Sequence, residues 1–264
     1  MQEKQVIIKI ENVSKTFGNG NGRVVALDNL NLSIREGEFN VIIGPSGCGK
    51  STLLYLLAGF EKPNSGQILL DGVTIRKPGP DRGFVFQDYA LFPWKTVLGN
   101  VMFGLNHTGW PKEKALERAQ ELIALVHLQG FERAYPHTLS GGMKQRVGIA
   151  RALAYDPKVL LMDEPFGALD AQTRKHMQQE LVSIWERTRK TVVFITHSVI
   201  EAVYLADRII VMTARPGQVK GDIQVNVPRP RSYTEDAYLN VRSQVLALLE
   251  EEVEKAIQRD RTIH

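Results

Sequence analysis

Gly44-Pro-Ser-Gly-Cys-Gly-Lys-Ser51 is the stretch that decides the fold of this 264-residue chain. The β-branched run Phe39–Ile43 leads into it, and the apolar, helix-compatible stretch Ser51–Ala58 follows it and ends at Gly59. Glycines allow the backbone to curl so that successive N–H groups point inward, and the start of a helix adds the positive end of its dipole. A strand, a glycine-rich loop and a helix in this order predict a site for phosphate groups.

The spacing of this loop fits G-x-x-x-x-G-K-[ST], the P-loop pattern of nucleotide-binding proteins. We predict that Lys50 places a positive charge near the β- and γ-phosphates of ATP and that the Ser51 hydroxyl binds Mg²⁺. Cys48 is expected to contribute its backbone N–H rather than its thiol. The alternative is a glycine-rich structural turn. The residues predicted to bind ATP in this loop are Gly44, Pro45, Ser46, Gly47, Cys48, Gly49, Lys50, Ser51 and Thr52.

A second strand supplies acidic groups that match this loop. The apolar run Val159–Met162 predicts a buried strand, which delivers Asp163 and Glu164 to its C-terminal end, where α/β sheets bind ligands. We expect Asp163 to hold Mg²⁺ through a water molecule and Glu164 to polarise the attacking water. A carboxylate at a strand end is often only solvated, so this interpretation depends on the phosphate loop.

The rest of the chain alternates strands with helices, which indicates an α/β fold with a largely parallel sheet. The dipeptide Asp71-Gly72 is typical of a two-residue hairpin turn, and Asn19–Gly22 forms a turn cluster. We predict a helical inset at about 88–156. Further strands are expected at 5–10, 24–34, 67–70, 73–75, 83–86, 191–196 and 208–212, and helices at 112–128, 140–154, 172–187 and 199–205.

The C-terminal part changes character beyond Pro228 and Pro230. An amphipathic pattern there predicts a helix, with Glu250, Glu251 and Glu254 opposite its apolar stripe. The stripe consists of Val241, Val245, Leu248, Leu249 and Val253. We therefore expect a nucleotide-binding domain over residues 1–230, which contains the helical inset, and a helical tail over 231–264.

The composition is that of a globular protein, with 43% hydrophobic and 23% charged residues. The net charge of +4 is spread over the chain, which favours a solvated surface over contact with nucleic acid or lipid headgroups. The single cysteine excludes a disulfide within the chain and is typical of a reducing compartment. No apolar run approaches the ~18–20 residues that span a bilayer, so any role at a membrane is expected to be peripheral.

Leu139-Ser-Gly-Gly-Met-Lys-Gln-Arg146 closely resembles the signature of the ATP-binding-cassette (ABC) family, usually Leu-Ser-Gly-Gly-Gln. Met143 stands in place of the usual glutamine, at a position that varies in the family. Ser140 can cap a helix. Gly141 and Gly142 at the start of that helix expose N–H groups, which would make it a second helix end that can bind an anion. The alternative is a loop before a helix. The resemblance implies a P-loop NTPase cassette with a mainly parallel core sheet, an antiparallel β subdomain and an inserted helical subdomain.

Other landmarks of the family follow in its order between residue 5 and about 215. The resemblance implies that Phe17 stacks on adenine, that Gln87 links the Mg²⁺ site to the permease contact, and that His197 senses the γ-phosphate. Asp170, in Ala168-Leu-Asp170, matches the loop that crosses between two subunits. Phe17 taken alone is more typical of a core residue, and a histidine at a strand end is usually structural. The implied catalytic residues are Glu164, His197 and Gln87, and the implied metal-binding residues are Ser51, Gln87 and Asp163.

The resemblance also implies partners. Two cassettes would meet head-to-tail around two ATP molecules, each held by the phosphate loop of one chain and Ser140–Gly142 of the other. The partners implied are a second ATP-binding subunit (identical or a paralogue), the permease subunits in the membrane and, indirectly, an extracytoplasmic solute-binding protein. The chain would lie at the cytoplasmic face of the membrane, and no nucleic acid partner is expected.

One branch of the family is especially similar. Phe84-Val-Phe-Gln-Asp-Tyr-Ala-Leu-Phe-Pro-Trp94, Pro80-Asp-Arg82 and Thr213-Ala-Arg-Pro-Gly217 resemble importers of nitrate, taurine, aliphatic sulfonates, bicarbonate and related anions. The alternative function is a non-transport ABC ATPase that acts on nucleic acid or the ribosome. Translation factors usually carry two cassettes, repair ATPases insert a long coiled coil, and a regulator without turnover would lose Glu164 or His197. The sequence therefore favours transport.

Overall fold

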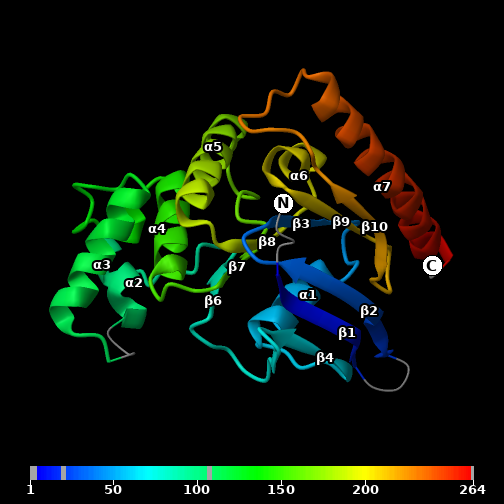
Figure 1. Ribbon diagram of the computed structural model, residues 1–264, viewed down its shortest axis with the longest axis horizontal. Helices are drawn as coiled ribbons and strands as arrows, with labels where there is room; N and C mark the ends of the chain where they lie inside the picture. The colour runs from blue at the N-terminus through cyan, green and yellow to red at the C-terminus, as the bar shows by residue number, and fades with distance from the viewer. Residues whose placement is uncertain (1–4, 19–21, 106–108, 263–264) are drawn as a thin grey trace. The chain divides into compact units, whose positions relative to one another are not determined.

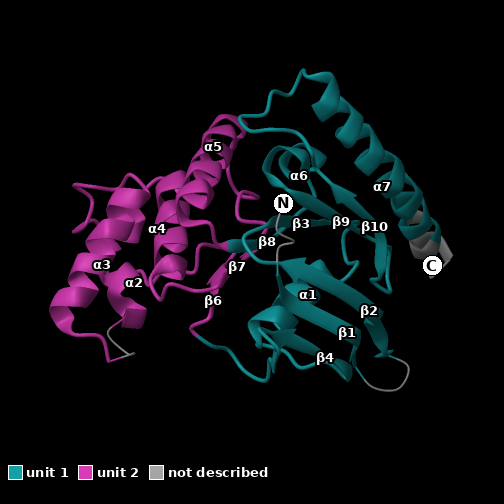
Figure 2. Cartoon of the chain, in the orientation of Figure 1, with its two compact units in different colours: residues 1–79, 191–264 teal, residues 80–190 magenta. Residues whose placement is uncertain are grey.

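The computed structural model describes residues 5–18, 22–105 and 109–262 (Figure 1). The chain forms two compact units, one of residues 1–79 and 191–264 and the other of residues 80–190 (Figure 2). Most of the predicted turn cluster Asn19–Gly22 lies outside the described residues. The domain boundary expected at residue 230 stays a prediction.

An antiparallel sheet of the first unit has the strand order β2-β1-β4-β5. These strands span Val24–Arg35, Val6–Phe17, Ser65–Leu70 and Val73–Thr74 in that order. Between β4 and β5, Asp71 and Gly72 have φ values of 50° and 75°, as a two-residue type I′ turn requires. The predicted hairpin is therefore confirmed, and so is the antiparallel part of the predicted fold.

Parallel strands of the first unit carry the phosphate loop. β3 (Phe39–Ile43) lies between β8 (Thr191–Thr196) and β9 (Arg208–Met212), and every residue of the three is buried. α1 (Lys50–Ala58) follows β3, and α6 (Val199–Leu205) follows β8. Strands buried on both faces are rich in apolar residues, which is why the pattern predicted all three.

β10 (Val219–Gln224) was not predicted. It pairs antiparallel with β9 and forms an edge of the sheet. Its sequence, Val-Lys-Gly-Asp-Ile-Gln, alternates too weakly to be recognised, and its residues are half-buried or exposed. Pairing with β9, rather than its own hydrophobicity, makes this segment a strand.

The second unit combines two parallel strands with helices. The strands are β6 (Arg82–Val85) and β7 (Val159–Asp163). The helices are α2 (Val97–Leu105), α3 (Lys112–Leu125), η2 (Pro136–Thr138), α4 (Gly141–Leu153) and α5 (Ala171–Thr188). α3, α4 and α5 lie where helices were predicted, and α2, α3 and α4 pack against one another. α2 was missed, because it is short and contains two glycines.

The C-terminal helix α7 (Asp236–Thr262) lies along α6, β9 and β10 of its own unit (Figure 1). Val245 and Leu249 are buried, as the predicted stripe requires. Val253 departs from that prediction, since it is 42% exposed, whereas the charged Glu252 is only 1% exposed. The physical reason is that the Glu252 carboxylate accepts a hydrogen bond from the buried Ala214 N–H and pairs with Lys220 of β10, so the buried charge has a counter-group.

Among the residues that the structure describes, no helix has both the length and the apolar character needed to cross a lipid bilayer.

Candidate functional site

The phosphate loop connects β3 to α1 in the first unit. Gly47 and Gly49 have φ values of 71° and 102°, in the left-handed region that favours glycine. A Cβ atom at Gly49 would lie 2.7 Å from the carbonyl oxygen of Ala26 on β2. Both the backbone conformation and the close neighbour therefore require glycine at this position.

The Lys50 side chain binds the backbone of the phosphate loop. The side chain is buried, with Lys50 6% exposed, and its Nζ donates hydrogen bonds of 2.9 Å to the carbonyl oxygens of Gly44 and Pro45. Cys48 is buried beside it. Burial raises the pKa of the Cys48 thiol, and the charge of Lys50 opposes this only in part. Burial thus favours the neutral thiol, which argues against a nucleophilic role for Cys48.

His197 begins the turn after the strand next to the phosphate loop. In the parallel register of β3 and β8, Ile43 is opposite Thr196, so Gly44 and His197 follow the two strands at the same edge of the sheet. The Thr196 hydroxyl donates to Glu201 at 2.5 Å and accepts from the Ser198 amide at 3.0 Å. The register of β3 and β8 thus brings Gly44 and His197, two predicted site residues, to one edge of the sheet.

Glu201 is a residue that the sequence interpretation missed. It is 6% exposed, and its backbone N–H donates to the Ser198 Oγ, which caps α6. The sequence signal was available, because Ser198-Val-Ile-Glu201 has the Ser-x-x-Glu spacing of a helix capping box. Through its hydrogen bond with the Thr196 hydroxyl, Glu201 holds the turn that contains His197.

Phe17 ends β1 in the same unit and is 41% exposed. The Nζ of Lys15 lies 4.9 Å from the centre of its ring. An exposed aromatic ring at a strand end is suited to stacking on a base, and it argues against the alternative that Phe17 is a core residue.

In the second unit, β6 and β7 place Gln87 and the acidic pair at one sheet edge. Val85 is opposite Met162 in the parallel register, so Gln87 follows β6 on the side where Asp163 ends β7 and Glu164 follows it. Asp163 is 7% exposed. Gln87 also lies close to the turn after Glu164, because a Cβ atom at Gly167 would be 3.5 Å from the Gln87 amide nitrogen.

Glu164 has a strained backbone. Its φ of 41° lies in the left-handed region, which costs a non-glycine residue roughly 1–3 kcal/mol. The turn that imposes this conformation is closed by a 3.0 Å hydrogen bond from the Gly167 N–H to the Glu164 carbonyl oxygen. Arg174 of α5 holds the next residues, with 3.3 and 2.8 Å bonds to the carbonyl oxygens of Phe166 and Leu169. Such conformations persist where the surrounding structure enforces them, and they concentrate at functional sites.

The signature segment forms the start of α4. The Ser140 side chain accepts a 3.3 Å hydrogen bond from the Met143 N–H, which confirms the predicted cap. A Cβ atom at Gly141 would lie 3.1 Å from the Tyr89 hydroxyl, and one at Gly142 would lie 3.1 Å from the Thr173 methyl group. Both glycines therefore allow close packing at this helix end.

Asp170 has a local role that was not predicted. It caps α5, since its Oδ1 accepts hydrogen bonds of 3.1 and 3.0 Å from the amides of Gln172 and Thr173. Hydrogen bonds from Thr173 and then Gln172 hold the pKa of Asp170 below its ordinary value. An aspartate directly before a helical pattern is the usual signal for such a cap.

The predicted magnesium ligands are a hydroxyl, an amide and a carboxylate. These oxygen donors fit Mg²⁺, which prefers oxygen and retains several waters. Within the described ranges, no three His, Cys, Asp or Glu side chains gather as a metal site. A site with one carboxylate and phosphate oxygens does not need such a group.

The segment Tyr89–Trp94 belongs to no helix or strand, but several contacts hold it in place. Arg151 donates hydrogen bonds of 2.6 and 3.1 Å to the carbonyl oxygens of Ala90 and Tyr89. The Phe92 ring packs 4.3 Å from that of Phe103, measured between centroids. Trp94 is 71% exposed. The segment therefore exposes a large aromatic side chain to solvent.

Asn100 of α2 fastens the same segment. This buried side chain accepts from the Phe92 N–H at 2.8 Å and donates to the carbonyl oxygens of Phe92, Lys95 and Thr96 at 3.0–3.2 Å. We expect Asn100→Ala to lower the free energy of unfolding by about 2–4 kcal/mol, because it leaves buried polar groups without partners. Urea denaturation would measure the change.

The exposed Asn64 serves as the control, because its side chain accepts a single hydrogen bond, from the Thr16 N–H. Asn64→Ala should cost less than about 1 kcal/mol. An equally small loss for Asn100→Ala would contradict the role given to Asn100.

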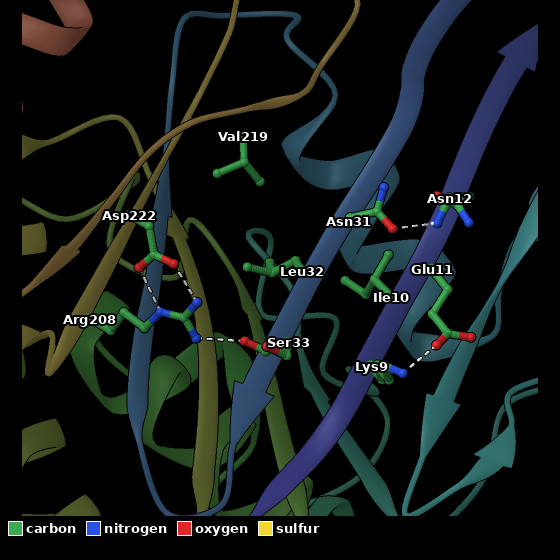
Figure 3. A pocket seen from close by; sticks show the side chains of 10 residues that line it. All are labelled: Lys9, Ile10, Glu11, Asn12, Asn31, Leu32, Ser33, Arg208, Val219 and Asp222. Carbon is green, nitrogen blue, oxygen red and sulfur yellow. Dashed lines mark hydrogen bonds and ion pairs between the residues drawn. The ribbon is translucent and has the colours of Figure 1, made fainter.

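A surface groove lies elsewhere on the first unit, beside the antiparallel sheet (Figure 3). Arg208 donates to both oxygens of Asp222 at 2.7 and 2.5 Å, and Lys9 pairs with Glu11 at 2.6 Å. The other residues that line it are Ile10, Asn12, Asn31, Leu32, Ser33 and Val219. These two positive and two negative charges balance, so the groove favours neither an anion nor a cation.

The fold and the loop define a P-loop nucleotide-binding α/β protein. The model of the ABC transporter family matches residues 27–167, more than half of the chain. This chain belongs to the ABC transporter ATP-binding family, and it is an ATPase. The predicted family and fold class are therefore confirmed.

Two curated relatives and one solved structure show how far the similarity extends. The uncharacterized ABC transporter ATP-binding protein MJ0412 of Methanocaldococcus jannaschii is 53% identical over 96% of this chain and 95% of its own length. The aliphatic sulfonates import ATP-binding protein SsuB of Bacillus cereus is 46% identical over 92% and 96%. A dimeric ATP-binding cassette, MJ0796, in a post-hydrolysis state with ADP and phosphate, is 36% identical, covers 84% of this chain and 100% of its own, and has a TM-score of 0.73.

Proposed function

We propose that this chain energises the import of a small anion through a separate membrane permease, as one of two cassettes that hydrolyse ATP together. The observation that carries the proposal is the 46% identity to a sulfonate-import subunit along 92% of the chain. The anion belongs to the nitrate, sulfonate, taurine or bicarbonate class. The same similarity to an importer weighs against the alternative of an ABC ATPase that acts on nucleic acid or the ribosome.

The site residues take the following roles. The loop Gly44–Thr52 binds the phosphates of ATP with Lys50, and the exposed ring of Phe17 stacks on adenine. Glu164 orients and polarises the attacking water, while His197 contacts the γ-phosphate. The Mg²⁺ ion would be held by Ser51, Gln87 and, through water, Asp163, and it would neutralise charge on the phosphates. Support comes from the phosphate-loop geometry and the strained turn at Glu164.

The partners follow from the same proposal. A second cassette contributes Ser140–Gly142 and the loop of Asp170 to the ATP site, and the solved cassette MJ0796 is a dimer. The segment Tyr89–Trp94 contacts the permease, which places the chain at the cytoplasmic face of the membrane. A solute-binding protein outside the cell delivers the anion.

Uptake by a reconstituted complex tests this function. The permease that co-purifies with the tagged chain in detergent would be placed in vesicles with ATP inside or outside. ATP-dependent accumulation of labelled taurine, an alkanesulfonate, nitrate or bicarbonate would support the proposal and select the anion. Co-purification with ribosomes or nucleic acid in place of a membrane protein would overturn it.

A point substitution tests the permease contact. We expect Trp94→Ser to reduce co-purification of the permease by about tenfold or more, because a largely exposed tryptophan at an interface is a frequent energetic anchor. Basal ATPase activity should stay within about twofold of wild type, since an exposed side chain contributes little to stability. Quantitative pull-down and a phosphate-release assay are the measurements.

Trp110 is a matched control, since it is an exposed tryptophan of the same unit outside this segment. Trp110→Ser should leave co-purification unchanged. Unchanged recovery of the permease with Trp94→Ser would contradict the proposed contact.

A further inference from the structure

Residues 213–218 connect β9 to β10 and are here called the 213–218 turn. Its ends are joined by a 2.9 Å hydrogen bond from the Thr213 N–H to the Gln218 carbonyl oxygen. The Thr213 hydroxyl accepts from the Gln218 N–H at 2.9 Å and donates to the Pro216 carbonyl oxygen at 2.8 Å. These bonds join the two ends of the turn and tie its tip to Thr213.

One side of this turn lies against the phosphate loop. The Arg215 Nε donates a 3.2 Å hydrogen bond to the carbonyl oxygen of Gly47. Gly217 is so close that a Cβ atom there would be 2.2 Å from the carbonyl oxygen of Cys48. The Gly217 N–H also donates to the Ala26 carbonyl oxygen at 2.8 Å, which ties the turn to β2. The turn therefore contacts the phosphate loop at the carbonyl oxygens of Gly47 and Cys48.

The other side of the turn is held by α7. The Glu252 Oε2 accepts a 2.8 Å hydrogen bond from the N–H of Ala214, the residue before Arg215. Its Oε1 pairs with Lys255 at 2.6 Å and with Lys220 of β10 at 3.2 Å. Burial by itself would raise the pKa of Glu252, but these hydrogen bonds outweigh it and hold the pKa below its ordinary value. Glu252 is therefore a buried, ionised acceptor for the turn.

We propose that Glu252 is a positioning residue for the phosphate loop, so that the docking of α7 on the 213–218 turn sets the affinity of the chain for ATP. The path of this coupling consists of two hydrogen bonds. The first joins the Glu252 carboxylate to the Ala214 N–H, and the second joins Arg215, the next residue, to the Gly47 carbonyl oxygen. A carbonyl held from outside keeps the loop amides turned inward, in the arrangement that phosphate oxygens need. This inference rests on the proposed role of Gly44–Thr52 as the ATP site.

Conservative variants of Glu252 separate its hydrogen bond from its charge. Glu252→Asp keeps the charge but draws the carboxylate back by one methylene, out of reach of Ala214. Glu252→Gln keeps an acceptor at the same reach but removes the charge. Equilibrium binding of ATP to the full chain in EDTA, where no turnover occurs, is measured well below the unfolding midpoint.

We expect Glu252→Asp to raise the Kd for ATP about five- to tenfold, within the usual range of coupling between sites. Glu252→Gln should stay within about twofold of wild type. With Mg²⁺ present, Glu252→Asp should raise KM for ATP far more than it lowers kcat, a split that a purely structural role of Glu252 would not produce.

Glu251 provides the matched control, because it pairs with the same Lys220 at 2.6 Å but is 59% exposed and lies outside the path. Glu251→Gln should bind ATP like wild type. Arg215→Ala, at an exposed position, should weaken ATP binding, and adding Glu252→Asp to it should cause no further loss, since both act through one contact.

The outcomes divide clearly. Wild-type ATP affinity in Glu252→Asp, or losses that add in the double variant, would overturn the proposal. If Glu252→Asp does not fold, Arg215→Ala decides in its place, because unchanged ATP affinity there breaks the path. Lys50→Ala separates this inference from the proposed function: if it binds ATP normally, the loop is not the ATP site and both fail. Weak binding by Lys50→Ala with normal binding by Glu252→Asp removes only the role of Glu252.

Discussion

Replacing Glu164 by Gln is expected to lower steady-state ATP turnover by roughly 10²–10⁴-fold, while ATP affinity stays near that of wild type. The amide keeps the shape and the hydrogen-bonding reach of the carboxylate, but it cannot accept a proton from the attacking water. The strained backbone at Glu164 is imposed by the turn up to Gly167, so the substitution leaves the position of the side chain unchanged. The loss should therefore appear in kcat.

Phosphate release and equilibrium ATP binding would measure these two quantities on the same preparation. Glu121→Gln makes the same change of charge at an exposed residue of the same unit and should leave both unchanged. ATP should also persist in a closed dimer of the Glu164→Gln chain. Near-wild-type hydrolysis by that variant would remove Glu164 from the mechanism.

Hydrolysis by the purified chain is expected to require association of two copies. The phosphate loop supplies donors from one side of ATP, whereas the charge that develops on the γ-phosphate is best stabilised by donors from the opposite side as well. We propose that Ser140–Gly142 of a second chain supply them. ATPase activity per chain should then rise with protein concentration until dimers saturate, and light scattering would follow the mass across the dilution series.

Ser140→Arg tests the same shared site in one substitution. A bulky cation at this exposed helix start should abolish hydrolysis, while a single chain still binds ATP through Lys50 and Phe17. Ser140→Ala controls for the lost cap, which is worth about 1 kcal/mol of stability, and should retain measurable activity. A constant rate per chain in samples shown to be monomeric would exclude the two-chain site.

Much of the fold could be predicted because its signals are local. The glycine-rich loop, the apolar strands on either side of β3 and the Asp71-Gly72 hairpin are each encoded within a few neighbouring residues. The Ser140 cap was predicted for the same reason. β10 and α2 were not, because pairing with β9 and packing on α3 and α4 stabilise segments whose own patterns are weak.

Residues that support the site were harder to predict than residues within it. Motif spacing indicates the phosphate loop, Asp163 and Glu164, because nucleotide chemistry requires those groups in that order. Arg151 holds the Tyr89–Trp94 segment through hydrogen bonds to Ala90 and Tyr89, which lie 61 and 62 positions away in the sequence. No local pattern connects such partners.

The sequence by itself determined the class of protein, the order of its chemical groups and the strands that carry them, because these depend on short-range periodicity and motif spacing. Only the tertiary structure decided where the buried face of α7 lies beyond Leu249. The apolar stripe favoured Val253, whereas the structure buries Glu252, whose partner Ala214 is 38 residues away. A buried charge is tolerated where a lysine and a backbone amide meet it, and only the folded chain brings them together.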